Sequence, residues 1–344
     1  MPAPKRRSAF LAMPPADRSA AFAALSERAI VCPLAEVGSI GVDGPDAAGF
    51  LHGQLSSDVN ALAAGAWQWS SYNSPKGRML ASVLLARADA PDRYRALLAG
   101  DLAAAIAKRL SMFVLRAKVK VNDASPGRMT IGVAGPRAAD AVRSALGVVA
   151  TSGQVTAFDH GFLVGLADGR IVVDVDPTRG ESAIDALEAH ATRVDSGIWR
   201  WTRVRAGVPL LTAATSDQFV PQALNWELLG GVSFQKGCYP GQEIVARTQY
   251  LGRLKERLFA FRLAADEPSA GTRLYAPSFG DQACGTVIDA SPHPEGGAAL
   301  LAVAQRSAAE AETLHAGSLD GPPLERLPLP YAVPEPAAPR NRIA

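Results

Sequence analysis

Cysteine is scarce in this chain. Only three cysteines, Cys32, Cys238 and Cys284, occur among 344 residues, and they are widely spaced. An odd, scattered set of this kind does not build a disulfide framework and is typical of a protein kept in a reducing cytoplasm. The chain has no Cys-x-x-Cys pair, and a four-cysteine iron–sulfur cluster needs one more thiolate than the chain supplies. We therefore expect no stably bound metal, and any contact between a cysteine and iron is expected to be shared or transient.

An excess of charge of one sign is also absent. The 35 lysine and arginine residues nearly balance the 33 aspartate and glutamate residues, which leaves a net charge of +2. Binding to nucleic acid without sequence preference requires a concentrated basic face, so no direct contact with nucleic acid is expected. A long apolar run is missing too. The segment at 97–115 is interrupted by Asp101, Lys108 and Arg109, which predicts no bilayer span and no membrane role.

What the chain does have is a hydrophobic fraction of 48%, enough for two or three packed cores. Its first residues are basic and are followed by a short apolar stretch that ends at Pro14, unlike a secretory signal. We expect residues 1–28 to form a flexible tail. From residue 322 onward proline recurs too often for regular structure, so residues 322–344 are expected to form a second, Pro-rich tail.

An internal echo predicts two related units. The segment at 40–48 recurs in a similar form at 131–139, and in each copy a β-prone run meets Gly-Pro and then a helix-like segment. Strands are predicted on both sides of the turn at 74–77, and the alternation at 171–175 predicts a half-buried strand. Beyond residue 254, short β-prone runs separated by Gly, Pro and Asp predict a small β-barrel. The helices predicted from apolar spacing and stop signals cover residues 102–110, 182–191 and 198–206.

The segment KGCYPGQE, from Lys236 to Glu243, places an ammonium, a thiol and a carboxylate close together. Residues 244–250 have the composition of a short helix, so Cys238 is predicted near a helix entrance. Unpaired helix amides and the ammonium of Lys236 would both favour the thiolate form of Cys238. The competing interpretation is structural: Cys238 is then a small buried apolar residue, and the glycines serve only a turn.

This motif resembles the signature Lys-Gly-Cys-Tyr-x-Gly-Gln-Glu of the YgfZ family, folate-binding proteins of iron–sulfur cluster assembly that are related to the T-protein of the glycine cleavage system. Other segments are also similar to those of the family, and the likeness runs from about Ile40 to Ala304. They are the segments at 50–59 (FLHGQLSSDV), 74–80 (SPKGRML), 201–209 (WTRVRAGVP), 219–226 (FVPQALNW) and 231–234 (GVSF).

The resemblance implies an α+β fold with T-protein-like architecture. Two α+β units would surround a central cavity over residues 29–253, and a C-terminal β-barrel would cover residues 254–321. The implied cofactor is tetrahydrofolate or a related folate, and the implied partners are iron–sulfur client enzymes and the assembly machinery. The expected function is therefore folate-dependent assembly or repair of iron–sulfur clusters in client enzymes, including radical enzymes that modify tRNA, in the cytoplasm.

The resemblance also implies roles for residues of the motif. Cys238 is the expected thiolate ligand or redox group, with transient contact to an iron–sulfur cluster, and Lys236 is its electrostatic support. Gly237 and Gly241 are expected to shape the backbone. Glu243 and Arg247, one helical turn apart, are expected to form an ion pair. The supporting residues are Gly237, Tyr239, Gly241, Gln242, Glu243 and Arg247.

A folate site needs apolar or aromatic walls, hydrogen-bond partners for the pterin edge, and cations for the anionic tail. The aromatic candidates are Trp67, Trp69, Tyr72, Trp199 and Trp226. The other candidates are the cations Lys76, Arg78 and Arg116 and the amide of Asn225. Burial in a core and solvation at the surface are the competing interpretations of these aromatic and charged residues.

Two acidic features of the T-protein are missing from this sequence. Its Gly-Gly-x-x-Asp-Asp stretch, whose first acid polarises the folate, corresponds to residues 77–82 (GRMLAS). Its Gly-Tyr-Thr-Gly-Glu loop, whose carboxylate grips the pterin, has only a loose counterpart at 167–170 (ADGR). A transition state that needs a carboxylate in a fixed place gains nothing from alanine. We therefore expect no aminomethyl transfer and keep it as the weakest alternative.

Two other functions stay open. A cysteine hydrolase needs a histidine base beside the thiol. All five histidines are distant from Cys238 in sequence, which leaves contact in space open; they are His52, His160, His190, His293 and His315. A non-catalytic adaptor would instead carry folate as a structural ligand and recognise client proteins through its β-barrel.

Overall fold

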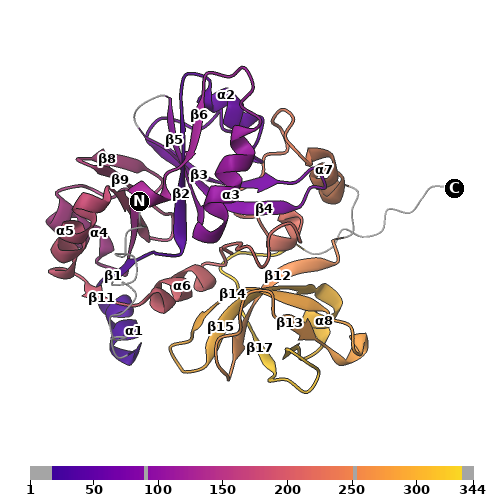
Figure 1. The fold of residues 1–344 in the computed structure, drawn as a ribbon. Coiled ribbons are helices and arrows are strands. Elements are labelled where there is room, and N and C mark those ends of the chain that lie inside the picture. Colours follow the sequence, from indigo (N-terminus) through magenta and orange to yellow (C-terminus); the bar gives the residue numbers. More distant parts are fainter. Residues whose placement is uncertain (1–17, 89–91, 251–253, 335–344) are drawn as a thin grey trace, which may run out of the picture.

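The computed structural model describes residues 18–88, 92–250 and 254–334. Two α+β units lie side by side, and a third sheet packs below them (Figure 1). The first unit has the strand order β3-β4-β5-β2-β6. Its elements are β2 (Val37–Asp43), α2 (Ala47–His52), β3 (Ala66–Asn73), β4 (Met79–Arg87), β5 (Arg93–Ala99), α3 (Gly100–Ser111) and β6 (Lys120–Asp123). The hairpin predicted around the turn at 74–77 is confirmed as β3 and β4.

The second unit has the strand order β11-β1-β7-β10-β9-β8. Its strands are β1 (Ile30–Pro33), β7 (Met129–Ala134), β8 (Val155–Phe158), β9 (Gly161–Gly165), β10 (Ile171–Val175) and β11 (Thr192–Arg193). Its helices are α1 (Arg18–Glu27), α4 (Ala138–Leu146), α5 (Pro177–Glu188) and α6 (Ser196–Arg205). Strand β10 is buried along its whole length, not half-buried as predicted, because one face packs on α4 and α5 and the other faces the first unit.

The internal echo corresponds to equivalent strand–turn–helix units, β2 with α2 and β7 with α4. Gly44 and Gly135 follow the two strands with φ of +137° and +111°, a conformation that L side chains rarely adopt. A Cβ at Gly44 would lie 2.3 Å from the carbonyl oxygen of Lys118, and one at Gly135 would lie 2.6 Å from that of Arg28. The repeated glycine is therefore needed where another chain segment crosses the turn.

The third sheet is antiparallel, with the strand order β16-β13-β14-β15-β12-β17, and it curls into a half-barrel. Its elements are β12 (Glu256–Leu263), β13 (Arg273–Tyr275), β14 (Gly285–Pro292), β15 (Ala298–Gln305), α8 (Arg306–Ala311), β16 (His315–Ala316) and β17 (Leu324–Leu327). The predicted strands of the C-terminal domain are thus present. The predicted boundary at 253/254 falls at residues 251–253, which lie outside the described part of the chain.

Both predicted tails are partly structured. Helix α1 covers residues 18–27 and buries Ala21, Ala24 and Leu25 in the core between the units, whereas residues 1–17 lie outside the description. At the other end β17 pairs with β12, and the hydroxyl of Tyr331 donates to the Gly207 carbonyl over 2.7 Å. Residues 335–344 lie outside the described residues. Burial of a few apolar side chains gives secondary structure to segments for which composition alone predicts no regular structure.

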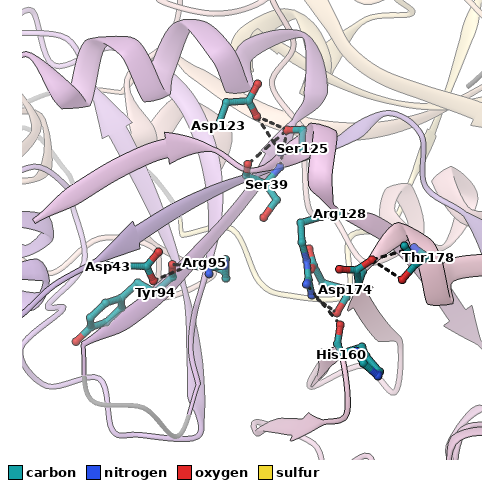
Figure 2. Close-up of polar contacts among 11 residues, drawn as sticks. Ser39, Asp43, Tyr94, Arg95, Asp123, Ser125, Arg128, His160, Asp174 and Thr178 are labelled. Atoms are coloured by element: carbon teal, nitrogen blue, oxygen red, sulfur yellow. Dashed lines mark hydrogen bonds and ion pairs between the residues drawn. The ribbon is translucent and has the colours of Figure 1, made fainter. Parts of the chain in front are cut away.

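A buried ion pair lies where the two α+β units meet (Figure 2). The Arg128 guanidinium donates through Nε to Asp174 Oδ1 and through Nη2 to the Asp174 carbonyl, the latter over 2.7 Å. Asp174 on β10 is fully buried, and burial raises the pKa of its carboxyl group. Nearby, the Ser39 amide on β2 donates to Ser125 Oγ over 3.0 Å. The ion pair joins the start of β7 to β10 within the second unit, and the Ser39 contact attaches β2 of the first unit to the segment that leads into β7. Among the described helices, none is long and apolar enough to cross a membrane.

Candidate functional site

The approach to the KGCYPGQE motif is held by buried serines from the first unit. Ser56 Oγ donates to the Gly231 carbonyl over 2.6 Å and accepts from Ser71 Oγ over 2.8 Å. The Ser233 amide donates to the Ser56 carbonyl over 2.9 Å. The segment at 50–59 therefore holds residues 231 and 233, which lead into the motif. We call residues 236–241 the motif loop.

Lys236 fastens the motif loop to the end of α2. Its ammonium donates to the carbonyls of His52 and Leu55, the latter over 2.6 Å, and it lies 4.9 Å from the centroid of the Tyr239 ring. A lysine that satisfies the last carbonyls of a helix stabilises that helix end. Burial lowers the pKa of Lys236 to about 8, and the nearby Asp58 and Cys238 oppose the shift. Lys236 thus holds the loop in place and also lies within electrostatic range of the thiol.

Gln242 brackets the two residues at the tip of the motif loop. Its side-chain Oε1 accepts from the Tyr239 amide over 3.3 Å, and its Nε2 donates to the Lys236 carbonyl over 3.4 Å. Gly237 and Cys238 lie between these two attachments. Helix α7 (Gln242–Tyr250) begins at this glutamine, so the predicted short helix is confirmed. The Gln242 side chain therefore closes the loop, and the Cys238 thiol lies at its tip.

The turn at 74–77 docks against the motif loop beside α7 (Figure 1). Gly241 has φ +77°, and a Cβ there would lie 2.4 Å from the Ser74 carbonyl oxygen and 2.5 Å from Gly77 Cα. Gly241 therefore shapes the backbone, as predicted. Gly237 has no positive φ, and the one neighbour that its Cβ would meet is His52 Nε2 at 3.7 Å. The expected backbone role does not apply to Gly237.

Cys238 is exposed, whereas Cys32 and Cys284 are buried. Burial raises the pKa of both buried thiols. The interpretation of Cys238 as a small core residue is therefore wrong, and this thiol is accessible to solvent and to a partner. The side chains of Glu243 and Arg247 are also exposed, and within the described residues no ion pair joins them, so that prediction is wrong as well.

A histidine lies next to the motif loop, although it is far away in sequence. His52 is the last residue of α2, and its Nδ1 is 3.2 Å from Asp58 Oδ1. Its other ring nitrogen, Nε2, faces Gly237. The fold thus brings an imidazole and a carboxylate to the neighbourhood of Cys238. Within the described ranges, no group of three or more His, Cys, Asp and Glu side chains is arranged to hold a metal ion.

A cavity of about 70 Å³ lies between the two units and α6. Three of the five aromatic candidates, Trp69, Trp199 and Trp226, line it. The other two aromatic candidates lie elsewhere: the Trp67 indole donates to the Gly165 carbonyl over 2.9 Å, and Tyr72 is in the core of the first unit. The remaining lining residues are Leu34, Val37, Ser82, Leu84, Leu97, Leu98, Leu166, Arg170, Val172, Arg203, Val208, Pro209 and Leu210.

The predicted polar folate contacts do not line this central cavity. Asn225 is fully buried with φ +56°, and its amide donates to the Leu258 carbonyl over 3.0 Å, which is a structural role. Lys76 and Arg78 are exposed on the turn beside the motif loop, and Arg116 is exposed after α3. The charges of Lys76 and Arg78 therefore face solvent beside the motif loop, and the charge of Arg116 faces solvent after α3. Sequence could not separate these positions, because which side of a turn faces the cavity depends on packing.

Two arginines that we did not assign to the site supply the cations of the central cavity. Arg170 is buried, donates to Asp168 Oδ2 through Nε over 2.8 Å and through Nη2 over 2.6 Å, and lies 5.7 Å from the centroid of the Trp199 ring. Arg203 forms a buried ion pair with Asp289 at 2.8 Å. Arg170 belongs to the loop in which the T-protein pattern requires a carboxylate. The arginine that replaces this carboxylate is visible in the sequence and could have indicated Arg170 as a residue of the cavity.

The lining suits folate chemically, but the cavity alone lacks the space. Tryptophan walls and arginines suit a flat ring with an anionic tail, yet ligand pockets usually measure about 300 Å³ or more. The Trp199 ring packs so closely on Gly132 that a Cβ there would lie 2.5 Å from it. A cleft of about 450 Å³ adjoins the cavity and shares Arg203 and Leu210 with it.

Comparison with known proteins places the chain in a family. A family model described as the GCVT N-terminal domain matches residues 17–164. The tRNA-modifying protein YgfZ of Edwardsiella ictaluri (strain 93-146) is 30% identical over 300 residues, which cover 85% of this chain and 89% of that protein. The protein of the same name from Yersinia pestis (strain Pestoides F) is 31% identical, with the same coverage. The chain belongs to the YgfZ family.

A solved structure shows the fold that the YgfZ family shares with aminomethyltransferases. The glycine cleavage system aminomethyltransferase T from Bartonella henselae superposes with a TM-score of 0.76 at 17% identity and covers 91% of this chain and 89% of that one. The expected T-protein-like α+β architecture is thus confirmed. Two of the segments that carry the likeness to YgfZ, at 50–59 and 74–80, contact the segment at 231–234 or the KGCYPGQE motif.

Proposed function

We propose that this chain supports iron–sulfur enzymes, including enzymes that modify tRNA, through the exposed thiol of Cys238. The observation that carries the proposal is the construction of the motif loop, in which buried groups fix an accessible cysteine. Thiolates are preferred ligands of iron–sulfur clusters. The names of the YgfZ relatives, tRNA-modifying proteins, support a role in tRNA modification. The chain's near-neutral charge supports action through client proteins and not on RNA directly.

One thiolate offers a cluster only part of its ligand set, since iron–sulfur clusters are usually held by four cysteines. Cys238 would therefore share a cluster, or an iron atom, with the ligands of a client enzyme during assembly or repair. Lys236 and Gln242 keep the loop in one conformation, which reduces the entropy lost when a partner binds. The ammonium of Lys236 would stabilise negative charge on the sulfur.

Tetrahydrofolate, or a related folate, is the proposed ligand of the central cavity and its adjoining cleft. Trp69, Trp199 and Trp226 would contact the ring, and Arg203, shared by the two spaces, would lie near the anionic tail. A bound folate would supply a one-carbon carrier; the structure assigns no step to it.

Complementation tests the proposal. A strain that lacks this gene would receive the wild type, Cys238→Ala or the matched control Cys284→Ala, and the modified nucleosides of its tRNA would be measured by mass spectrometry. We expect Cys284→Ala to restore the modification made by an iron–sulfur enzyme and Cys238→Ala to fail at equal protein level. Full restoration by Cys238→Ala would overturn the proposed role of the thiol.

A non-catalytic adaptor is the second candidate. The central cavity favours it, since Cys238 is not among the residues that line the cavity and would not reach a ligand bound there. The adaptor predicts that Cys238→Ala both binds the client enzyme and restores its activity. The thiol role predicts binding without restoration. Affinity measurements with a purified client, alongside the complementation test, separate the two.

A further inference from the structure

Three large apolar side chains project into solvent from the segment between α3 and β6. They are Met112, Phe113 and Leu115, whose exposed fractions are 61%, 46% and 88%. Among the described residues six large apolar side chains are exposed, and half of them lie within these four positions. Exposed apolar side chains that gather in one place mark interaction sites, whereas single ones scattered over a surface need no explanation. This cluster is therefore a candidate interaction surface.

Cations surround these apolar side chains. Residues 102–122 contain five lysine and arginine residues and no aspartate or glutamate. Four of the cations are exposed, and within the described residues no ion pair involves any of them. Cations that lack a counter-ion from their own chain favour a partner that supplies carboxylates. We call the seven residues the α3–β6 patch: Lys108, Met112, Phe113, Leu115, Arg116, Lys118 and Lys120.

Leu115 is held in a backbone conformation that leucine rarely adopts. Its φ is +44°, in the left-handed region, and its side chain gains no burial there. The turn around it is nonetheless well anchored, because Val114 packs against the core of the first unit and the Ala117 amide donates to the Val114 carbonyl over 2.8 Å. Strained residues persist where surrounding contacts impose the conformation, and they cluster at functional sites. The fold therefore presents Leu115 to solvent at a cost in stability.

Helix α2 lies between the α3–β6 patch and the motif loop. The Lys118 amide donates to Asp46 Oδ2 over 2.6 Å, and Asp46 directly precedes α2. At the other end of α2, the His52 carbonyl accepts from the Lys236 ammonium of the motif loop. A helix of six residues is about 9 Å long, and a specific interface covers about 800 Å² of each partner. The patch and the motif loop are therefore close enough for one partner protein to contact both.

The composition of the patch favours a protein partner. A symmetric contact with a second copy of the chain would bring the same unpaired cations face to face. Single-stranded nucleic acid binds to cations interleaved with aromatic side chains on which bases stack, and this patch has one aromatic and two aliphatic side chains. Apolar centres with methionine and aromatic residues inside a charged rim are typical of protein–protein interfaces.

We propose that the α3–β6 patch docks a protein whose surface carries an apolar recess rimmed by carboxylates, and that this protein is an iron–sulfur client of Cys238. Met112, Phe113 and Leu115 would enter the recess, and the surrounding cations would face the carboxylates. The docking is argued from the patch alone, whereas the identity of the partner as an iron–sulfur client rests on the proposed function.

Site-specific photocrosslinking in cells identifies the partner. Phe113→p-benzoylphenylalanine would be compared in the full chain with Val149→p-benzoylphenylalanine, because Val149 is equally exposed but lies in the second unit. We expect position 113 to crosslink to an iron–sulfur protein at least about tenfold more than position 149, in a segment that mass spectrometry shows to combine apolar residues with Asp or Glu. A crosslink to RNA, to lipid or to a protein without a cluster would overturn the proposal, as would equal crosslinking at the two positions.

Binding of the purified captured protein then tests the chemistry of the patch by biolayer interferometry at low and high salt. Phe113→Ser should raise the Kd about tenfold. Lys118→Glu should slow association and weaken its dependence on salt, because a cation at the rim steers the encounter. The matched controls, Val149→Ser and Arg179→Glu, alter exposed residues of the second unit and should bind as the wild type does. Unchanged affinity in Phe113→Ser would overturn the docking.

A variant of Leu115 separates docking from folding. Asparagine adopts positive φ more readily than leucine, so Leu115→Asn should raise the urea midpoint of unfolding while it weakens binding of the captured protein about tenfold. A role in the fold alone predicts no loss of binding in a variant that is more stable. Unchanged binding, or a fall in both the midpoint and the binding, would contradict the inference.

The outcomes separate this inference from the proposed function of the thiol. If Phe113→Ser loses binding to the captured iron–sulfur protein while Cys238→Ala complements fully, the docking stands and the role of the thiol is wrong. If Cys238→Ala fails to complement while Phe113→Ser binds and complements as the wild type does, the role of the thiol stands and the docking is overturned.

Discussion

Replacing Gly241 by alanine would test whether the motif loop depends on its contact with the turn at 74–77. The new Cβ would meet backbone atoms at 2.4 and 2.5 Å, and φ is +77°, so neither a side-chain rotation nor a small shift relieves the clash. A left-handed conformation costs a non-glycine residue about 1–2 kcal/mol, and overpacking adds about 1–3 kcal/mol. We expect the free energy of unfolding to fall by about 2–5 kcal/mol.

Gly237→Ala is the matched control for this substitution, because its Cβ would make one ordinary contact and its φ is not positive. Urea unfolding followed by circular dichroism gives the free energies, and we expect the control to lose less than about 1 kcal/mol. Alkylation of Cys238 provides a local measurement, since a displaced turn frees the loop. Equal stabilities of the two alanine variants would refute the reasoning that the backbone requires glycine at position 241 and not at position 237.

Three further predictions concern charge and the cavity. Burial lowers the pKa of Lys236 from 10.5 to about 8, so between these pH values the unfolded chain binds more protons than the folded chain. The free energy of unfolding of the wild type relative to that of Lys236→Met should therefore rise from pH 8 to pH 10.5. A difference that does not change with pH in urea unfolding would contradict this. Arg128→Ala leaves a buried carboxylate unpaired and should cost about 3–5 kcal/mol, whereas Arg143→Ala, in an exposed pair, should cost less than about 1 kcal/mol in the same assay. Tetrahydrofolate should quench tryptophan emission less in Trp199→Phe than in Trp67→Phe after inner-filter correction, and equal quenching would argue against binding in the central cavity.

Local sequence signals predicted the elements whose apolar pattern and turns are visible along the chain. The hairpin around the turn at 74–77 and the helices α3 and α6 follow from alternation, apolar spacing and stop signals, and the structure contains each of them. Helix α1 was missed because it has few distinguishing charges or caps and is ordered by burying Ala21, Ala24 and Leu25 between the units. That burial is a tertiary effect, which periodicity over ten residues does not reveal.

In the candidate site too, local sequence predicted some features, and others arise only from the fold. The KGCYPGQE motif predicted the position of the thiol and the helix that follows it. The contacts of the motif loop could not be predicted from the sequence, because the fold directs the hydrogen bonds of Lys236 to carbonyls of α2 and brings His52 next to Gly237. Glu243 and Arg247 have the spacing of an ion pair, but exposed side chains gain little from pairing in water. Spacing along a helix permits such a contact without enforcing it.

The segment after β17 has a consequence for how this protein can be shortened or fused. Tyr331 reaches back to the Gly207 carbonyl, and the neighbouring Val208 and Pro209 form part of the cavity wall. The segment around Tyr331 therefore links the half-barrel to the α+β units. Truncation before residue 322 would remove both β17 and the Tyr331 contact beside this wall, so a C-terminal purification tag is better attached after Tyr331.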